Sequence, residues 1–115
     1  MICNLTDKKC VPCEGGVPAL TSEQAKSYLQ QLQDWKINPE KTEIHKTFTF
    51  KNYYHVMAFV NAAAFIAHQE KHHPDLEVQY NKVVIRYSSH AIGGLSENDF
   101  ICAAKVDQLN GKNTF

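Results

Sequence analysis

The sequence predicts a single α+β domain: four short strands in one mainly antiparallel sheet, with about three helices packed on one of its faces. The chain has 115 residues, which suits one domain with one hydrophobic core. Helical and strand-type periodicities follow one another in the order α-β-β-α-β-β-α. Because amphipathic helices can cover only one face of such a sheet, the other face meets solvent, a partner subunit or a ligand.

The helices are predicted from capping residues and from apolar residues that recur at spacings of three and four. Thr21 and Gln24 fit a capping box that begins the first helix. The second helix is expected to run from Asn52 to about His72. Pro74 stops it, because proline lacks an amide hydrogen and restricts the residue before it.

The strands are predicted in two pairs by alternating polar and apolar residues. One pair lies within residues 35–50, divided by a turn that contains a proline, and the other forms a hairpin within residues 76–88 around Asn81–Lys82. Ser96, followed three residues later by Asp99, is expected to cap the last helix.

The first twenty residues predict an irregular arm, and residues 21–115 the domain itself. Cys10 and Cys13 have a spacing found in zinc sites, with Cys3 as a conceivable third ligand, but no second pair follows to complete four ligands. We therefore expect reduced thiols in the arm. Cys102 falls within a helical pattern and is expected to be a small core residue.

Composition and charge exclude several classes of protein. Twelve basic residues balance twelve acidic ones, so the chain lacks the basic excess of proteins that bind nucleic acid or anionic membranes. No run of about 18 apolar residues occurs, and the N-terminus lacks the apolar stretch of a signal peptide. We expect a cytoplasmic protein that binds a small molecule.

Three histidines are the main candidates for chemistry. His72 and His73 are adjacent at the expected end of the long helix, and His90 follows the second strand of the hairpin. A hairpin brings its two ends together, so these side chains are expected to face one another across a shallow pocket. Histidine titrates near neutrality, which makes it the side chain best suited to exchange protons at pH 7.

The residues around these histidines resemble a known family. The run from Glu70 to Phe100, EKHHPDLEVQYNKVVIRYSSHAIGGLSENDF, is similar to the signature of the pterin-4a-carbinolamine dehydratase family. The resemblance is specific across residues 70–109, extends back to Thr21 and leaves out the first twenty residues. It implies the same α+β fold, assembly into homodimers or homotetramers, and no metal or redox cofactor.

The resemblance also implies a reaction and a role for each site residue. The family removes water from a 4a-hydroxytetrahydropterin to give the quinonoid dihydropterin, which recycles the cofactor of aromatic amino-acid hydroxylases. By the family's pattern, His72 and His90 are acid/base residues on either side of the pterin ring, and His73 binds and orients the pterin. Supporting positions are taken by Asp99, Pro74 and Glu70. We expect Asp99 to cap a helix rather than to act as a catalyst.

The chain departs from the family's pattern beside the paired histidines. Some members carry acidic residues at the positions of His68 and Lys71. Either Glu70 supplies the missing carboxylate or the three histidines suffice, and both alternatives stay open. Ser89 replaces the commoner threonine before His90 and keeps a hydroxyl group.

Two other functions compete with dehydration. His68 and His72 stand four residues apart on a helix, so with His90 they form a possible three-histidine metal site. The second alternative is a protein-binding module, because some relatives also act as dimerisation partners of a transcription factor.

Overall fold

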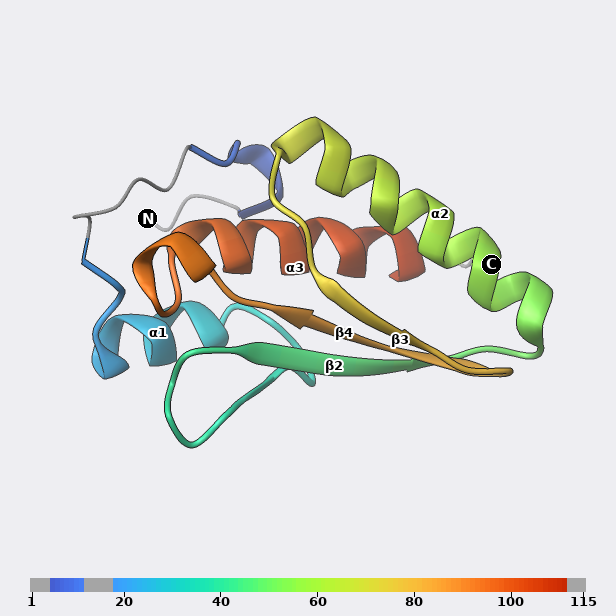
Figure 1. Cartoon of the computed structure of the whole chain (residues 1–115), viewed down its shortest axis with the longest axis horizontal. Coiled ribbons are helices and arrows are strands. Elements are labelled where there is room, and N and C mark those ends of the chain that lie inside the picture. The colour runs from blue at the N-terminus through green and yellow to red at the C-terminus, as the bar shows by residue number, and fades with distance from the viewer. Residues whose placement is uncertain (1–4, 12–17, 112–115) are drawn as a thin grey trace.

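The structure, a computed structural model, describes residues 5–11 and 18–111 and confirms the predicted fold class (Figure 1). Within these residues three α-helices surround one face of a four-stranded antiparallel sheet. The helices are α1 (Ser22–Leu29), α2 (Tyr53–Glu70) and α3 (Glu97–Gly111). The strands are β1 (Lys36–Ile37), β2 (Ile44–Thr49), β3 (Asp75–Val78) and β4 (Lys82–Tyr87). Two 3-10 turns, η1 (Leu5–Asp7) and η2 (His90–Ile92), complete the elements.

The strands follow the order β1-β2-β4-β3, with β2 and β4 in the centre. The β2–β4 register pairs Ile44 with Tyr87 and Phe48 with Val83, and all four side chains are buried under the helices. His45 pairs with Arg86 on the opposite face, which is therefore polar. The sheet thus has one apolar face for the core and one face compatible with water.

The predicted capping box at the start of α1 is present. The hydroxyl oxygen of Thr21 accepts a hydrogen bond from the Gln24 amide, and the Gln24 side chain accepts one from the Thr21 amide. The predicted turn between β1 and β2 is also present, because the Asn38 side-chain oxygen accepts from the amides of Thr42 and Glu43.

Helix α2 ends earlier than the sequence predicts. Asn52 caps its start through a bond from the His55 amide, but the helix stops at Glu70, not near His72. Lys71 adopts a left-handed conformation with φ of 54°, and the His72 amide then bonds to the Ala67 carbonyl. This left-handed residue closes the helix before Pro74 can act. His72 and His73 consequently lie in the extended segment that leads into β3.

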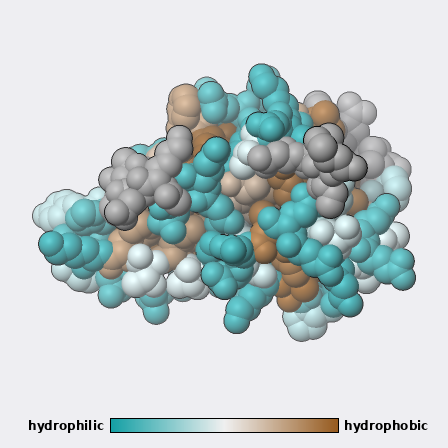
Figure 2. Space-filling view, turned by 180° about the vertical axis from the view of Figure 1, so that it is seen from behind, coloured by the Kyte–Doolittle hydropathy of each residue, from teal (hydrophilic) through white to brown (hydrophobic). Residues whose placement is uncertain are grey.

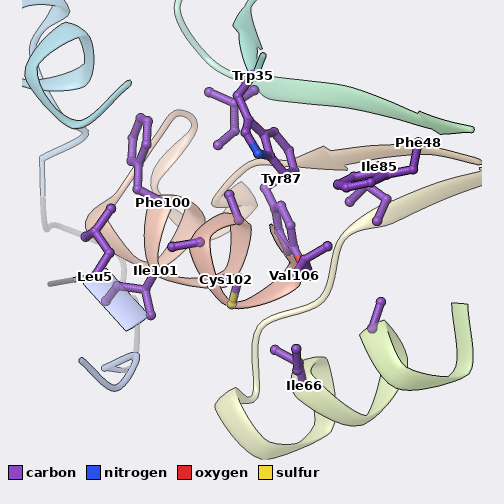
Figure 3. Packing of buried hydrophobic residues seen from close by; sticks show 14 of the residues in the cluster. Leu5, Trp35, Phe48, Ile66, Ile85, Tyr87, Phe100, Ile101, Cys102 and Val106 are labelled. Carbon is purple, nitrogen blue, oxygen red and sulfur yellow. The ribbon is translucent and has the colours of Figure 1, made fainter. Parts of the chain in front are cut away.

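Aromatic side chains organise the core beneath the helices (Figure 3). The Trp35 ring lies 6.0 Å from the Tyr87 ring and 6.2 Å from the Phe48 ring. Leu5 from the arm is also buried, beside Ile101 of α3 in Figure 3. The arm was expected to be irregular, yet its described part includes the η1 turn and packs against α3.

Apolar side chains reach the surface at one edge of the sheet and on α2. Leu76 and Val78 of the edge strand β3 are 38% and 41% exposed, and Phe65 on α2 is 60% exposed. Seen from behind, the surface is mostly hydrophilic and hydrophobic residues break through it in patches (Figure 2). Among the described residues, no helix is long and apolar enough to cross a membrane.

Candidate active site

His72 is held by a buried carboxylate from α3. Its Nε2 lies 2.6 Å from Oδ1 of Asp99, a residue in the first turn of α3. The side chain of Asp99 is fully buried and that of His72 is 12% exposed. A buried carboxylate needs partners that replace its lost hydration, and His72 is one of them.

The other oxygen of Asp99 completes a small network at the start of α3. Oδ2 accepts hydrogen bonds from the Ser96 amide and the Ser89 hydroxyl, both at 2.9 Å. The hydroxyl oxygens of Ser89 and Ser96 lie 2.7 Å apart. The predicted capping role of Asp99 is therefore present, but the same carboxylate also contacts His72. Helix capping is thus only one of the contacts that the Asp99 carboxylate makes, and the capping pattern did not predict the contact with His72.

A glycine turn brings this network together. Gly93 has φ of 66°, which favours glycine, and it ends the η2 turn that begins at His90. The Ser89 amide donates to the Gly94 carbonyl at 2.8 Å, so the chain folds back on itself between Ser89 and Gly94. This fold places Ser89 beside Ser96 and leaves His90 exposed.

Tyr87 supports the imidazole of His72 from the sheet. The two rings stack with centroids 6.1 Å apart and planes inclined by 11°. The Tyr87 hydroxyl is buried and has no hydrogen-bond partner among the described residues. Burial, with nearby thiols and carboxylates, raises the pKa of Tyr87 well above its ordinary value, so the phenol stays neutral.

The three predicted histidines, His72, His73 and His90, line one pocket of about 440 Å³. This volume lies in the range of sites for small organic molecules. The Nδ1 of His73 lies 3.3 Å from the Pro74 carbonyl oxygen, and the Nε2 of His90 lies 3.4 Å from the Ser88 hydroxyl. The lining residues come from the arm, the end of α2, the loop after β4 and the start of α3: Cys10, Val11, Glu70, Lys71, His72, His73, Ser88, Ser89, His90, Ala91 and Asn98.

Glu70 lines the pocket, but its carboxylate is engaged on both oxygens. Oε1 accepts from the Cys10 amide and Oε2 pairs with the Lys105 ammonium, both at 2.8 Å. Burial by itself would raise the pKa of Glu70, but the Cys10 amide and Lys105 outweigh it and hold the pKa below its ordinary value. Glu70 is thus an ionised anchor for the arm, and nothing in this geometry frees it to exchange protons.

The three-histidine metal alternative finds no support in the geometry. His68 is exposed on α2, while Nε2 of His72 is directed at Asp99. The described residues contain no group of three or more His, Cys, Asp or Glu side chains placed to hold a metal ion.

The structure describes Cys10 alone among the three arm cysteines considered as zinc ligands. Cys3 and Cys13 lie outside the described residues. The sulfur of Cys10 lies 3.6 Å from that of Cys102, and both are free thiols. Cys102 is buried, as the helical pattern predicted.

Sequence reasoning missed several contributors to this site. Tyr87 was assigned only to a strand, Cys10 was considered only as a zinc ligand, and no role in the site was predicted for Asn98 or Val11. Strand alternation does place Tyr87 on the core face beside Ile85, so the signal for its burial was present. No pattern in the sequence indicated that the arm reaches the pocket.

Comparisons with known proteins agree on one family. The family model described as "Pterin 4 alpha carbinolamine dehydratase" matches residues 18–109. A protein of Nitrosomonas eutropha is 61% identical over 109 residues, covering 94% of this chain and 95% of its own length. A protein of Dechloromonas aromatica is 51% identical over 107 residues, covering 93% and 94%. Both are described as candidate pterin-4-alpha-carbinolamine dehydratases.

A solved structure shares the fold. It is the crystal structure of a transcriptional coactivator/pterin dehydratase from Brucella melitensis, with a TM-score of 0.76 and 27% sequence identity. The match covers 79% of this chain and 97% of that one. The match to the Nitrosomonas protein extends into the arm, whereas the family model begins at residue 18.

Proposed function

The chain belongs to the pterin 4 alpha carbinolamine dehydratase family, and we propose on this premise that it removes water from a 4a-hydroxytetrahydropterin to give the quinonoid dihydropterin. The observation that carries the proposal is the pocket shared by His72, His73 and His90, in which His72 is paired with the buried Asp99.

The reaction needs a base and an acid but little else. The proton on N5 of the pterin leaves, the electron pair of the N–H bond forms a double bond to C4a, and the C4a–O bond breaks. The departing hydroxyl takes up a proton and leaves as water. Groups that titrate near neutrality on either side of the ring supply both steps at pH 7.

The proposed base is His72. Because Nε2 faces Asp99, Nδ1 is the nitrogen left for the substrate. The carboxylate fixes the tautomer of the imidazole and stabilises the positive charge that it gains on taking up the N5 proton. The stacked Tyr87 ring holds the plane of the imidazole, which keeps Nδ1 in one direction.

The proposed acid is His90, which protonates the leaving hydroxyl. It is exposed on the η2 turn and lies on the pocket wall built by the loop after β4. His73 is proposed to bind and orient the pterin, since it lines the pocket next to His72 and is exposed. Pro74 supports this arrangement, because it sets an extended backbone at His73.

We further propose a homo-oligomer as the working form. Apolar side chains are exposed on β3 and in the turn between β3 and β4, including Leu76, Val78 and Tyr80. An unpaired strand edge with apolar side chains invites pairing with a second copy. The proposed setting is the cytoplasm, where the free thiols of Cys10 and Cys102 stay reduced, with an aromatic amino-acid hydroxylase as the source of the substrate.

A direct assay tests the dehydratase proposal. Chemically made 4a-hydroxytetrahydropterin decays spontaneously, and the protein should accelerate this decay at catalytic concentration. A double variant, His72→Ala with His90→Ala, should fall to the spontaneous rate, while His68→Ala on the exposed face of α2 should keep full activity. Decay at the spontaneous rate with the wild-type protein overturns the proposal. Unchanged turnover in the double variant overturns the assigned roles.

The same double variant addresses the protein-binding alternative. The Brucella melitensis structure carries the description "transcriptional coactivator" beside "pterin dehydratase". A docking role that uses the helical surface would survive the loss of both histidines. Dehydration would not survive it.

A further inference from the structure

Residues 10–11 of the N-terminal arm reach the pocket although they lie outside the residues that the family model matches. Figure 1 shows residues 5–11 of the arm, drawn in blue, beside α3 and the end of α2. Leu5 is buried in the core, and the Lys8 ammonium pairs with the Glu97 carboxylate. These contacts bring the next residues, Cys10 and Val11, to the pocket wall.

Asn98 fixes the arm backbone at Val11 with two opposed hydrogen bonds. Its side-chain Oδ1 accepts from the Val11 amide at 3.1 Å, and its Nδ2 donates to the Val11 carbonyl oxygen at 2.6 Å. Asn98 is 4% exposed, so both bonds form away from bulk water. A carboxamide that pairs with both backbone groups of one residue sets its position and its orientation, as a neighbouring strand would.

Glu70 fixes the arm one residue earlier. Its Oε1 accepts from the Cys10 amide at 2.8 Å, and Lys105 balances its charge from α3. The thiol of Cys10 points at Cys102, with the two sulfurs 3.6 Å apart. The backbone of Cys10 and its side chain are therefore both engaged with the body of the domain.

The side chain of Val11, whose backbone is held by Asn98, is exposed to solvent. It is 67% exposed, and most of the other residues that line the pocket have polar or charged side chains. Pockets for small molecules combine apolar surface with a few placed polar groups, and the isopropyl group of Val11 supplies apolar surface to this pocket. A reduced pterin has polar edges, which suit the histidine and serine side chains, and an apolar ring face, which suits an isopropyl group.

We propose that residues 10–11 of the arm form a wall of the pterin pocket, in which Val11 contacts the substrate and Asn98 and Glu70 are positioning residues that hold the wall in place. This inference rests on the proposed dehydratase function. The wall carries no free titratable group toward the substrate, so it contributes to binding and not to proton transfer. Its loss should raise KM and leave kcat nearly unchanged.

Three variants and one matched control test the wall. Val11→Ser removes the apolar contact at an exposed position that folding does not require, and Asn98→Ala removes both backbone bonds. We expect KM to rise roughly tenfold in each with kcat within about twofold of wild type. Val11→Leu, which keeps an apolar side chain, should keep the KM of the wild-type protein. Asn61→Ala, an exposed asparagine on α2 outside the pocket lining, should match wild type.

An equilibrium measurement separates this inference from the proposed function. Binding of 7,8-dihydrobiopterin, which has no 4a-hydroxyl to lose, should weaken in Val11→Ser and in Asn98→Ala by the same factor as KM rises. If the wild-type protein neither accelerates dehydration nor binds this probe, the proposed function fails. If the wild-type protein does both, and Val11→Ser binds and turns over like Asn61→Ala, the wall fails while the function stands.

Discussion

Nε2 of His72 and Oδ1 of Asp99 lie 2.6 Å apart and join the segment after α2 to the first turn of α3. The two residues are 27 positions apart in the chain. Because Asp99 is fully buried and also caps α3, the imidazole is fixed to a rigid element and not to a loop. The proton exchange proposed for His72 therefore depends on a helix terminus that has its own structural role.

Replacing Asp99 by Asn should lower kcat by about 10²- to 10³-fold, because the neutral amide neither stabilises the imidazolium nor fixes the tautomer of His72. The side chain keeps its shape and one oxygen for the Ser96 amide, so the helix cap should persist. Steady-state dehydration kinetics with far-UV circular dichroism measure both effects.

Asp107→Asn is the matched control for this variant. Asp107 also lies on α3 and accepts hydrogen bonds from Trp35 and Lys46, but it does not line the pocket. The Asp107→Asn protein should be somewhat less stable than wild type and should keep the wild-type kcat. An Asp99→Asn protein as active as the control would show that the carboxylate only caps the helix.

Replacing His73 by Ala should raise KM about tenfold and change kcat little, because the residue is exposed and is proposed to orient the pterin. His45→Ala, on the polar face of the sheet, serves as the control and should leave both constants unchanged. A large fall in kcat with normal KM would instead assign His73 to proton transfer.

Replacing Tyr87 by Phe should raise the free energy of unfolding by about 1 kcal/mol. The hydroxyl is buried without a partner among the described residues, and such a group costs about 1–3 kcal/mol. The ring that stacks on His72 is retained, so kcat should stay near wild type. Urea denaturation measures the stability change.

Tyr28→Phe should instead lower the free energy of unfolding. The Tyr28 hydroxyl donates to the Glu97 carboxylate at 3.0 Å, so its removal deletes a real hydrogen bond. Loss of stability in both variants would mean that the Tyr87 hydroxyl has a partner, such as an ordered water molecule.

Acidification should weaken the attachment of the arm. Lys8 lowers the pKa of Glu97 below its ordinary value, and the pKa of Glu70 is also lowered, by the Cys10 amide and Lys105 against the effect of burial. A carboxylate with a lowered pKa in the folded state stabilises the fold above its unfolded-state pKa, and that contribution disappears as the pH falls through the folded-state pKa. Stability should therefore fall in acid, below the ordinary glutamate range.

Glu70→Gln provides the check on this pH dependence. The variant should be less stable than wild type at pH 7, and the gap should narrow as the pH falls toward 3. Glu40→Gln, in the exposed turn between β1 and β2, should follow the wild-type curve. A constant gap between Glu70→Gln and wild type across this range would contradict the role of the Glu70 charge.

Exhaustive chelation should leave turnover unchanged. Nε2 of His72 is committed to Asp99, and the described residues assemble no cluster of three metal-ligating side chains. Loss of activity with EDTA, restored by a divalent cation, would instead support a metal site formed by His68, His72 and His90.

By itself the sequence determined the elements, their order and the identity of the three histidines. These features depend on contacts within a few residues, such as the capping box of Thr21 and Gln24, and on periodicities that follow from the geometry of a single helix or strand. The end of α2 was misplaced, because a left-handed conformation at Lys71 stops the helix before the proline that marks its end in the sequence.

Only the tertiary structure decided which groups meet at the pocket. The Asp99 carboxylate reaches His72 across 27 positions, and the Glu70 carboxylate reaches the Cys10 amide across 60. Such pairs have no fixed spacing in a sequence, since the packing of α3 against α2 and the sheet sets their distance. From the sequence, Glu70 was a candidate for the carboxylate missing at His68 and Lys71. The same packing makes it an anchor for the arm, because it places Lys105 and the Cys10 amide on its two oxygens.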